Sequence, residues 1–408
     1  MRAWLSGNRH RPVTLGGVSM SPDIEPLHVL LCGSTGTGKS TAIAEMLDSI
    51  TERGDRLICC DPNGSYLSQF GQVRDKVFNP FDARFEGWSV FNEIRADYDC
   101  ERLARSVVPD GSGDAAAWHH YAQVLLAEIL RALLKRGEAM TADLLRWATV
   151  EPSARLAELL VGTPAQGLFD PEAAKALAST RFVLASRLAA HRFLRPGEFS
   201  MRGWLETGGG NLFLTWRADM QAALAPLMGT AVDVLANAVL SSAAEIGRRV
   251  WLVLDELAAL GTLASLETAL TLGRKHGLCV VAGLQSTAQL DRLYGRQGAT
   301  VLRSCFRNLL VLGMARSDPD TADYLSRALG EREVLRRMES RGVGSQGASA
   351  NKSLHLERER LVLAAEISGL ENLRGFLAIA GSDTIQRVQL TPKARQSAVP
   401  AFVEVEAC

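Results

Sequence analysis

Short apolar runs alternate with an amphipathic stretch over the first eighty residues. The runs at 27–32 and 55–60 have the length of buried strands, and the stretch at 41–47 between them has the spacing of a helix. A shorter apolar piece follows at 77–80, and a glycine pair inside the run 13–20 predicts a hairpin. This β–α–β order indicates a parallel sheet with helices on its faces.

The pattern changes between about residues 87 and 200, where strand-like runs are absent and helical spacing dominates. Asp114 is expected to cap a helix that ends at Gly137, and Thr141 is expected to cap a second helix. Asp170-Pro171-Glu172 combines a cap, a first-turn proline and an early acid, which is a strong helix start. The segment therefore predicts an inserted all-helical domain.

Strand-like runs return after this segment. The run at 211–216 is followed by a long helical stretch at about 220–241. Three further apolar runs have the length of strands, at 250–254, 279–284 and 308–312, with helical stretches near 263–275 and 319–329.

The C-terminal part contains one polar segment and two final apolar runs. Residues 338–353 are rich in Gly, Ser and Arg and predict a mobile loop, whereas 376–380 and 385–390 predict a closing pair of strands. We therefore predict an α/β fold with a mostly parallel sheet plus an inserted all-α domain. The expected division is 1–86 for the first part of the α/β domain, 87–200 for the insert and 201–408 for the second part.

The residues that join the first strand to its helix form a phosphate-binding motif. Gly33-Ser34-Thr35-Gly36-Thr37-Gly38-Lys39-Ser40 fits G-x-x-x-x-G-K-[ST] at every fixed position, and the helix follows from Thr41. Glycines let backbone N–H groups curl around phosphate oxygens. Lys39 is predicted to reach the β and γ phosphates of ATP, and Ser40 to hold Mg²⁺. The strand before the motif and the helix after it disfavour a turn that binds nothing. We predict nucleotide binding by Gly33 to Thr41.

A second half of the same kind of site follows the run at 250–254, which ends in Asp255 and Glu256. Asp255 is predicted to hold the magnesium ion, and Glu256 to act as general base on the attacking water. A strand that runs into a solvated helix start would give the same local pattern. Lys39 in the same chain favours the catalytic interpretation, and the Asp-Glu pair is typical of hydrolysing motors rather than small-molecule kinases.

Three other polar residues stand at element ends. Gln285 ends the run at 279–284, where an amide on an adjacent parallel strand is well placed to sense the γ-phosphate. Arg274 precedes that strand and is either an arginine finger for a neighbouring subunit or a cation that complements a helix end. Asp61 ends the second strand, and we favour a role in its turn over one in the nucleotide site.

Composition narrows the class of protein without deciding it. The 45 basic and 45 acidic residues balance, so no global charge favours nucleic acid, although a local basic channel would still bind it. Seven scattered cysteines without a C-x-x-C pair indicate reduced thiols rather than a disulfide frame or zinc site. No apolar run reaches 18 residues, so we expect no transmembrane helix, and residues 1–10 lack the apolar core of a signal peptide.

Several longer motifs resemble the type IV secretion coupling proteins of the TraD/TrwB family. They are the phosphate loop with the segment 61–64, the stretch 87–95, the segment 254–258, and the run 273–290 that contains Arg274 and Gln285. The resemblance extends from about residue 13 to about residue 390. It implies a RecA-like P-loop motor domain with an inserted all-α domain, assembled as a homo-hexamer with ATP sites between subunits and DNA near a central channel.

The resemblance also implies function. It gives Arg274 the family's arginine-finger position, and it implies sequence-independent DNA binding and a role in conjugation that couples a relaxase–DNA complex to a type IV secretion channel. The expected location is the cytoplasmic face of the bacterial inner membrane. Family members commonly carry a membrane anchor before the motor, whereas this sequence starts at the motor, as a truncated, naturally soluble or misassigned form would.

Two alternatives and one DNA-binding hypothesis stay open at this stage. The chain could be another ring-shaped DNA pump, or a docking platform for relaxase and secreted proteins in which ATP acts as an assembly switch. A small-molecule kinase is disfavoured because no acceptor site is apparent. Arg292, Arg296, Arg303 and Arg307 form a candidate channel-facing stretch, against the alternative of a solvated, salt-bridged face.

Overall fold

The computed structural model describes residues 11–244, 247–344 and 347–405. The N-terminal segment 1–10, in which a signal-peptide core was not expected, lies outside the described residues, as does Cys408. The described strands are β1 Val13–Leu15, β2 Val18–Met20, β3 Val29–Cys32, β4 Arg56–Pro62, β5 Lys76–Phe78, β6 Leu212–Trp216, β7 Val250–Leu254, β8 Leu278–Leu284, β9 Asn308–Leu312, β10 Glu331–Gly344, β11 Gly347–Arg360, β12 Arg374–Ala378 and β13 Gln386–Gln389.

Nine of these strands form one central sheet in the order β13-β12-β9-β3-β8-β7-β4-β6-β5. The strands from β9 to β5 are parallel, and β12 and β13 complete one edge as an antiparallel pair. The predicted mostly parallel sheet and the closing strand pair are therefore confirmed. β3, β6, β7 and β8 are buried along their whole length, since both faces of a parallel sheet are covered.

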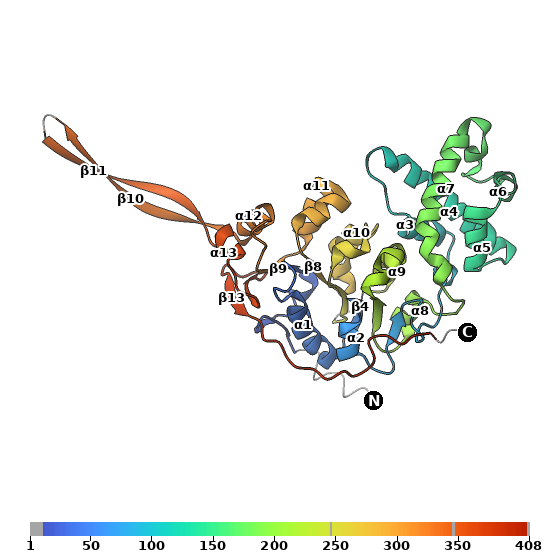
Figure 1. Cartoon of the computed structure of the whole chain (residues 1–408), viewed down its shortest axis with the longest axis horizontal. Coiled ribbons are helices and arrows are strands. Elements are labelled where there is room, and N and C mark those ends of the chain that lie inside the picture. The colour runs from blue at the N-terminus through green and yellow to red at the C-terminus, as the bar shows by residue number, and fades with distance from the viewer. Residues whose placement is uncertain (1–10, 245–246, 345–346, 406–408) are drawn as a thin grey trace.

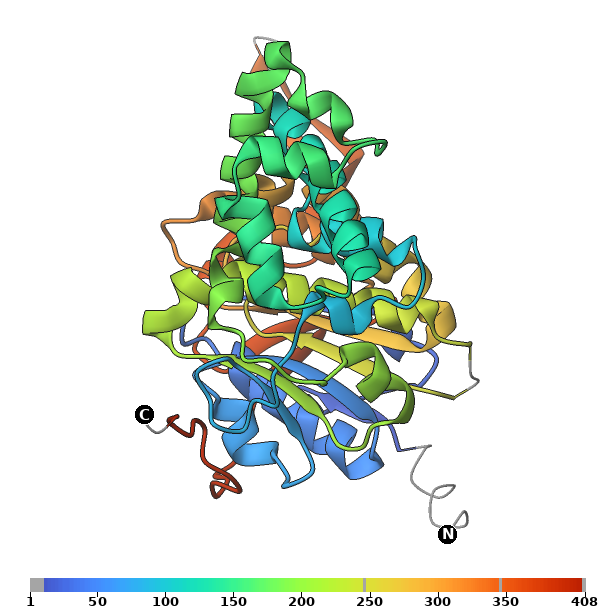
Figure 2. The same cartoon turned by 90° about the vertical axis from the view of Figure 1, so that its right-hand side faces the viewer.

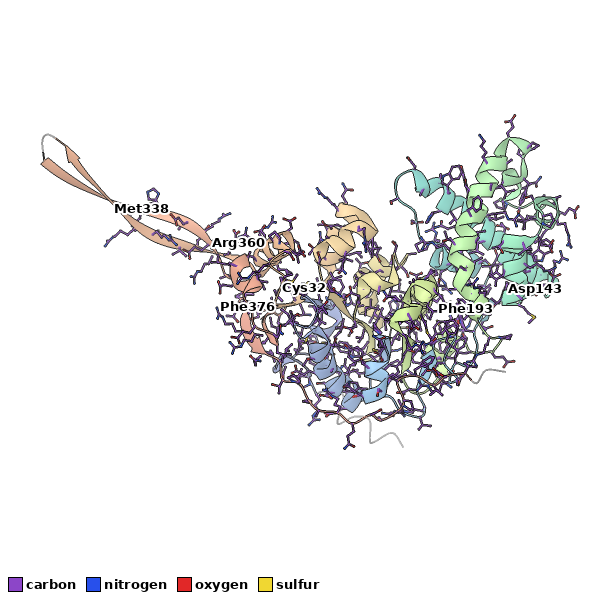
Figure 3. All side chains as sticks on the ribbon, viewed as in Figure 1. Cys32, Asp143, Phe193, Met338, Arg360 and Phe376 are labelled. Carbon is purple, nitrogen blue, oxygen red and sulfur yellow. The ribbon has the colours of Figure 1, made fainter. Side chains whose placement is uncertain are left out.

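Helices cover both faces of this sheet (Figure 1). One core, which includes Ile43, Leu47 and Tyr66, lies under α1 and α2; the other lies under α9, α10 and α11. Cys32, the last residue of β3, lies in the middle of the molecule (Figure 3). The described α-helices are α1 Lys39–Arg53, α2 Ser65–Phe70, α3 Asp99–Val107, α4 Ala116–Arg136, α5 Thr141–Leu145, α6 Ser153–Leu159, α7 Ala174–Leu188, α8 Met201–Thr207, α9 Gln221–Ser241, α10 Leu266–Leu272, α11 Thr287–Cys305, α12 Pro319–Leu329 and α13 Ala364–Ser368.

The helices α3 to α7, which we call the helical domain, stand together at one end of the sheet (Figures 1 and 2). The chain enters and leaves this domain side by side, because Trp88 and Phe199 form a parallel bridge. Buried Glu93 holds both crossings: it accepts hydrogen bonds from Trp88 Nε1 (2.9 Å) and from the backbone N–H of Met201 (2.7 Å). The boundaries at residues 87 and 200 stay a prediction.

A buried carboxylate on α9 joins the helical domain to the central α/β domain. Asp233 accepts a hydrogen bond from Ser106 Oγ of α3 at 2.5 Å. Its other oxygen accepts from the backbone N–H of Ser265 at 2.6 Å and from Ser265 Oγ at 2.5 Å. Ser265 lies nine residues after Glu256, between β7 and α10. One side chain therefore links the segment behind the Asp-Glu pair to the first helix of the helical domain.

Two predicted helix caps are wrong, and one is confirmed. α4 begins at Ala116 behind a 3-10 turn at Gly113–Ala115, so Asp114 lies inside that turn and not at the cap, although Gly137 does end the helix. Thr141 is the first residue of α5, after Met140 at the cap. A 3-10 turn comes before α4, and α5 begins one residue earlier than a cap at Thr141 would allow. Asp170 caps the turn before α7 as predicted.

The segment predicted as a loop at 338–353 is instead part of a long hairpin. β10 and β11 pair residue for residue from Glu331↔Arg360 to Gly344↔Gly347 and project from the sheet edge (Figure 1). Figure 3 shows Arg360 near its base and Met338 along its length. Opposite charges meet across the strands, as in Arg360–Glu331 at 3.1 Å and Arg336–Glu357 at 3.3 Å. Cross-strand charge pairs of this kind support strands that lack an apolar pattern.

Within the described residues, one helical stretch is long and apolar enough to cross a membrane. It runs through α9, from Ala218 to Ser241, and 72% of its most apolar window is buried inside the structure. α9 also contains Pro226 and packs against α3, α8 and α10. These contacts are those of a core helix.

Candidate nucleotide site

The phosphate loop joins the buried end of β3 to the first turn of α1. Gly36 and Gly38 have positive φ angles of 80° and 120°. The φ of Gly38 is one that residues with a side chain rarely adopt, so this position favours glycine. The loop is anchored from behind, since Ser34 N–H donates to Gly313 O at 2.9 Å and Ser34 Oγ accepts from Ala315 N–H at 2.8 Å.

A cavity of about 700 Å³ opens in front of the loop. The predicted site residues that line it are Thr35, Gly36, Gly38, Lys39, Ser40, Thr41, Asp255, Glu256 and Gln285. Gly33, Ser34 and Thr37 are not among its lining residues and instead support the loop, as the contacts of Ser34 show. Asp61 is likewise absent from the lining; it accepts a hydrogen bond from the Leu67 N–H at 2.6 Å, in keeping with the turn role we favoured.

Lys39 is buried at the base of this cavity. Its Nζ donates to Gly33 O at 2.6 Å and to Ser34 O at 3.2 Å, so the ammonium is folded back onto the loop. Burial lowers its pKa, while the nearby charges of Glu256 and Asp255 act in the opposite direction. The buried Lys39 ammonium therefore lies between two backbone carbonyl groups of the loop and the carboxylates of Asp255 and Glu256.

Asp255 and Glu256 follow β7 directly and both face the cavity. Glu256 Oε2 accepts a hydrogen bond from Gln285 Nε2 at 2.6 Å, while Oε1 is buried and has no partner within the described part of the chain. Burial raises the pKa of Glu256, which Gln285 and Lys39 partly offset. A carboxylate with one oxygen fixed and a raised pKa has the properties of a general base.

Gln285 directly follows β8, at the edge of the sheet where the phosphate loop and the Asp-Glu pair also lie. β8 lies between β3 and β7, so the end of β8 separates the phosphate loop from the Asp-Glu pair. Thr35 Oγ1 donates to Gln285 Oε1 at 3.2 Å, and the Gln285 amide donates to Glu256. The phosphate loop and Glu256 are thus connected through one side chain.

The predicted arginines fall in different places. Arg274 lies in the short helix Gly273–His276, exposed and outside the lining of its own chain's cavity. Arg303 is nearly buried: it pairs with Asp291 at 2.9 Å and lies over the Tyr324 ring. This ion pair fits the salt-bridged alternative for Arg303 better than a role in the channel-facing stretch. Arg307 lies beyond the end of α11, so it does not share that helix with Arg303.

Several lining residues were not predicted to belong to this site. Arg292 lines the cavity, although its position in the sequence suggested a role in the channel-facing stretch. The cavity is also lined by Pro62, the last residue of β4, and by Asn63 in the turn that follows, where the Asp-Pro-Asn-Gly sequence was the available signal. Leu373 comes from near the C-terminus, has a φ of 68°, and donates its N–H to Thr37 O at 2.9 Å. No local pattern marked it.

Comparison with known proteins places this site in a family. The family model described as the type IV secretion-system coupling protein DNA-binding domain matches residues 12–391. The chain belongs to this family. Coupling protein TraD of Escherichia coli (strain K12) is 28% identical over 410 residues, which cover 96% of this chain and 56% of TraD. Conjugal transfer protein TraG of Rhizobium radiobacter is 26% identical over 392 residues, covering 88% of this chain and 58% of TraG. The chain thus spans a little over half the length of these coupling-protein relatives.

Solved structures agree with membership of the coupling-protein family. Bacterial conjugative coupling protein TrwBdeltaN70 is 47% identical and superposes with a TM-score of 0.91, covering 97% of this chain and 92% of that chain. Plasmid coupling protein TrwB in complex with ADP and Mg²⁺ is 46% identical with a TM-score of 0.89, over the same shares of the two chains. The predicted RecA-like motor with a helical domain is confirmed as the fold of this family.

Proposed function

We propose that this chain is an ATP-hydrolysing, DNA-translocating coupling protein that links a relaxase–DNA complex to a type IV secretion channel in conjugative transfer. Family membership supports the coupling role. The observation that carries the hydrolytic role is Glu256, held by Gln285 through one oxygen while the other is buried and unpartnered within the described residues. In the proposed mechanism this second oxygen accepts a hydrogen bond from the attacking water.

The residues at the cavity fit ATP and Mg²⁺. Backbone N–H groups of the loop and the Lys39 ammonium would hold the phosphates. Ser40 and Asp255 supply the hydroxyl and carboxylate oxygens that Mg²⁺ prefers, and the ion when bound neutralises phosphate charge. Glu256 would accept a proton from the attacking water. Gln285 would hold Glu256 in place through its amide nitrogen, while its amide oxygen accepts a hydrogen bond from Thr35 of the phosphate loop.

The assembly that we propose is a homo-hexameric ring at the cytoplasmic face of the bacterial inner membrane. Arg274 is exposed and lies outside its own chain's cavity, which suits a residue that acts on the site of a neighbouring subunit. DNA contact would be through phosphates and hence independent of sequence and strongly salt-dependent. Arg296 is exposed and would be available to contact DNA phosphates.

Replacing Glu256 tests the hydrolytic role. Glu256→Gln should leave ATP binding within about threefold of wild type and reduce turnover by about a hundredfold or more, since it removes the base but not the phosphate contacts. We would measure ATP hydrolysis with and without single- and double-stranded DNA at low salt, and nucleotide binding by titration. Glu267→Gln, an exposed change in α10, serves as the control.

The outcome separates the motor from the docking platform. DNA-stimulated hydrolysis that is lost in Glu256→Gln supports the motor. Wild-type protein that binds ATP, hydrolyses none of it and is indifferent to DNA would instead support a docking platform switched by nucleotide.

A further inference from the structure

Tyr66 is a buried tyrosine that the proposed mechanism leaves without a role. It is the second residue of α2, and its side chain is 2% exposed. Its hydroxyl is buried and has no hydrogen-bond partner of ordinary geometry within the described residues. A buried hydroxyl without a partner destabilises the fold, so phenylalanine would be the more favourable core residue here.

The fold directs this side chain toward the predicted metal ligands. β4 and β7 are parallel neighbours, and Cys60 pairs with Leu254, so the chain leaves both strands at one edge of the sheet. Asp255 follows β7 at that edge, and α2 follows β4. The first turn of α2 is fixed because Asp61 accepts hydrogen bonds from Leu67 N–H at 2.6 Å and from Ser65 Oγ at 3.3 Å.

Packing brings the phenol to the strand that carries the predicted metal ligand, because Tyr66 shares one buried cluster with Val253 of β7, two residues before Asp255. Burial and, next, the charge of Asp255 raise the pKa of Tyr66, whereas the Ser40 hydroxyl lowers it. Burial raises the pKa of Asp255, and the Tyr66 and Ser40 hydroxyls oppose that rise. The phenol thus lies beside both residues that we assign to Mg²⁺.

We propose that Tyr66 is a positioning residue of the Mg²⁺ site, whose hydroxyl donates a hydrogen bond to the Asp255 carboxylate when the ion is bound. This inference rests on the proposed function. The bond occupies one carboxylate lone pair and orients the remaining ones toward the metal and Ser40. Outer residues of this kind fix the ligands of metal sites, and their loss commonly weakens metal binding by about 10–100-fold.

The test uses the full chain, ADP and Mn²⁺, with free Mn²⁺ followed by electron paramagnetic resonance. Tyr66→Phe removes only the hydroxyl and should weaken Mn²⁺ binding to the ADP-loaded protein by about tenfold. ADP binding in the presence of EDTA should stay at the wild-type value, since the phosphate contacts are intact. Tyr121→Phe, the same change at an exposed site in α4, should alter neither quantity.

The outcomes are distinguishable from failure of the proposed function. Mn²⁺ affinity of Tyr66→Phe within twofold of wild type would overturn the inference and leave the nucleotide site standing. Wild-type protein that binds neither ADP nor Mn²⁺–ADP would overturn both. Thermal unfolding of Tyr66→Phe at or above the wild-type midpoint shows that the metal effect is not a folding defect.

Discussion

Two histidines are buried as neutral imidazoles. His28 is fixed as one tautomer: its Nδ1 accepts from Val280 N–H at 3.1 Å, and its Nε2–H donates to Leu270 O at 2.9 Å. His191 is fully buried, and neither ring nitrogen has a hydrogen-bond partner within the described residues. Burial lowers the pKa of each to about 4, and for His28 the bond to Leu270 opposes this shift.

The unpartnered imidazole predicts how stability depends on pH. Because the folded-state pKa of His191 lies below the ordinary value of 6.5, the unfolded chain takes up a proton first as pH falls. The contribution of neutral His191 to the free energy of unfolding is present above about pH 6.5. It is lost as pH falls toward 4, by ~1.4 kcal/mol per pH unit. His191→Leu should abolish this contribution. Urea unfolding of both proteins from pH 7.5 to 4.5 measures it, and a constant difference in unfolding free energy across that range would refute it.

At the scale of elements, the sequence was informative where the pattern is local. Apolar runs marked the central strands, and the ends of the paired strands β7 and β8 place Gln285 beside Glu256. The pattern failed where contacts are distant. The β10–β11 hairpin depends on charges more than twenty residues apart, such as Arg336 and Glu357, and Leu373 reaches the cavity only because β12 closes the sheet.

The crossing between the motor and the helical domain depends on Glu93. Glu93→Ala would leave Trp88 Nε1 and the Met201 N–H buried without their acceptor, so we expect it to lower the free energy of unfolding by about 2–4 kcal/mol. Chemical denaturation measures this loss. Glu206→Ala, which removes the ion pairs of an exposed carboxylate with Arg95 and Arg202, should cost about 0–1 kcal/mol. Equal losses in the two variants would contradict the role of Glu93.

At the scale of the whole molecule, the exposed position of Arg274 predicts shared active sites. Arg274→Ala and Lys39→Ala should each lose ATP hydrolysis by about a hundredfold or more, the first through its neighbour's site and the second through its own. In an equal mixture, a site is complete where an Arg274→Ala subunit supplies Lys39 and a neighbouring Lys39→Ala subunit supplies Arg274. About a quarter of the sites meet both conditions, so about a quarter of wild-type activity should return. Steady-state hydrolysis after mixing measures this. A mixture as inactive as its components would show that Arg274 acts within its own chain.

The hydrogen bonds of Asp233 have a thermodynamic consequence. They tie Ser265, nine residues beyond Glu256, to Ser106 of the helical domain, so a shift at one end changes the energy at the other. Coupling free energy between two binding equilibria is reciprocal. If nucleotide alters the affinity of the helical domain for a cargo, that cargo alters nucleotide affinity by the same factor. A cargo that arrives at the far end of the molecule is then an effector of the ATP site.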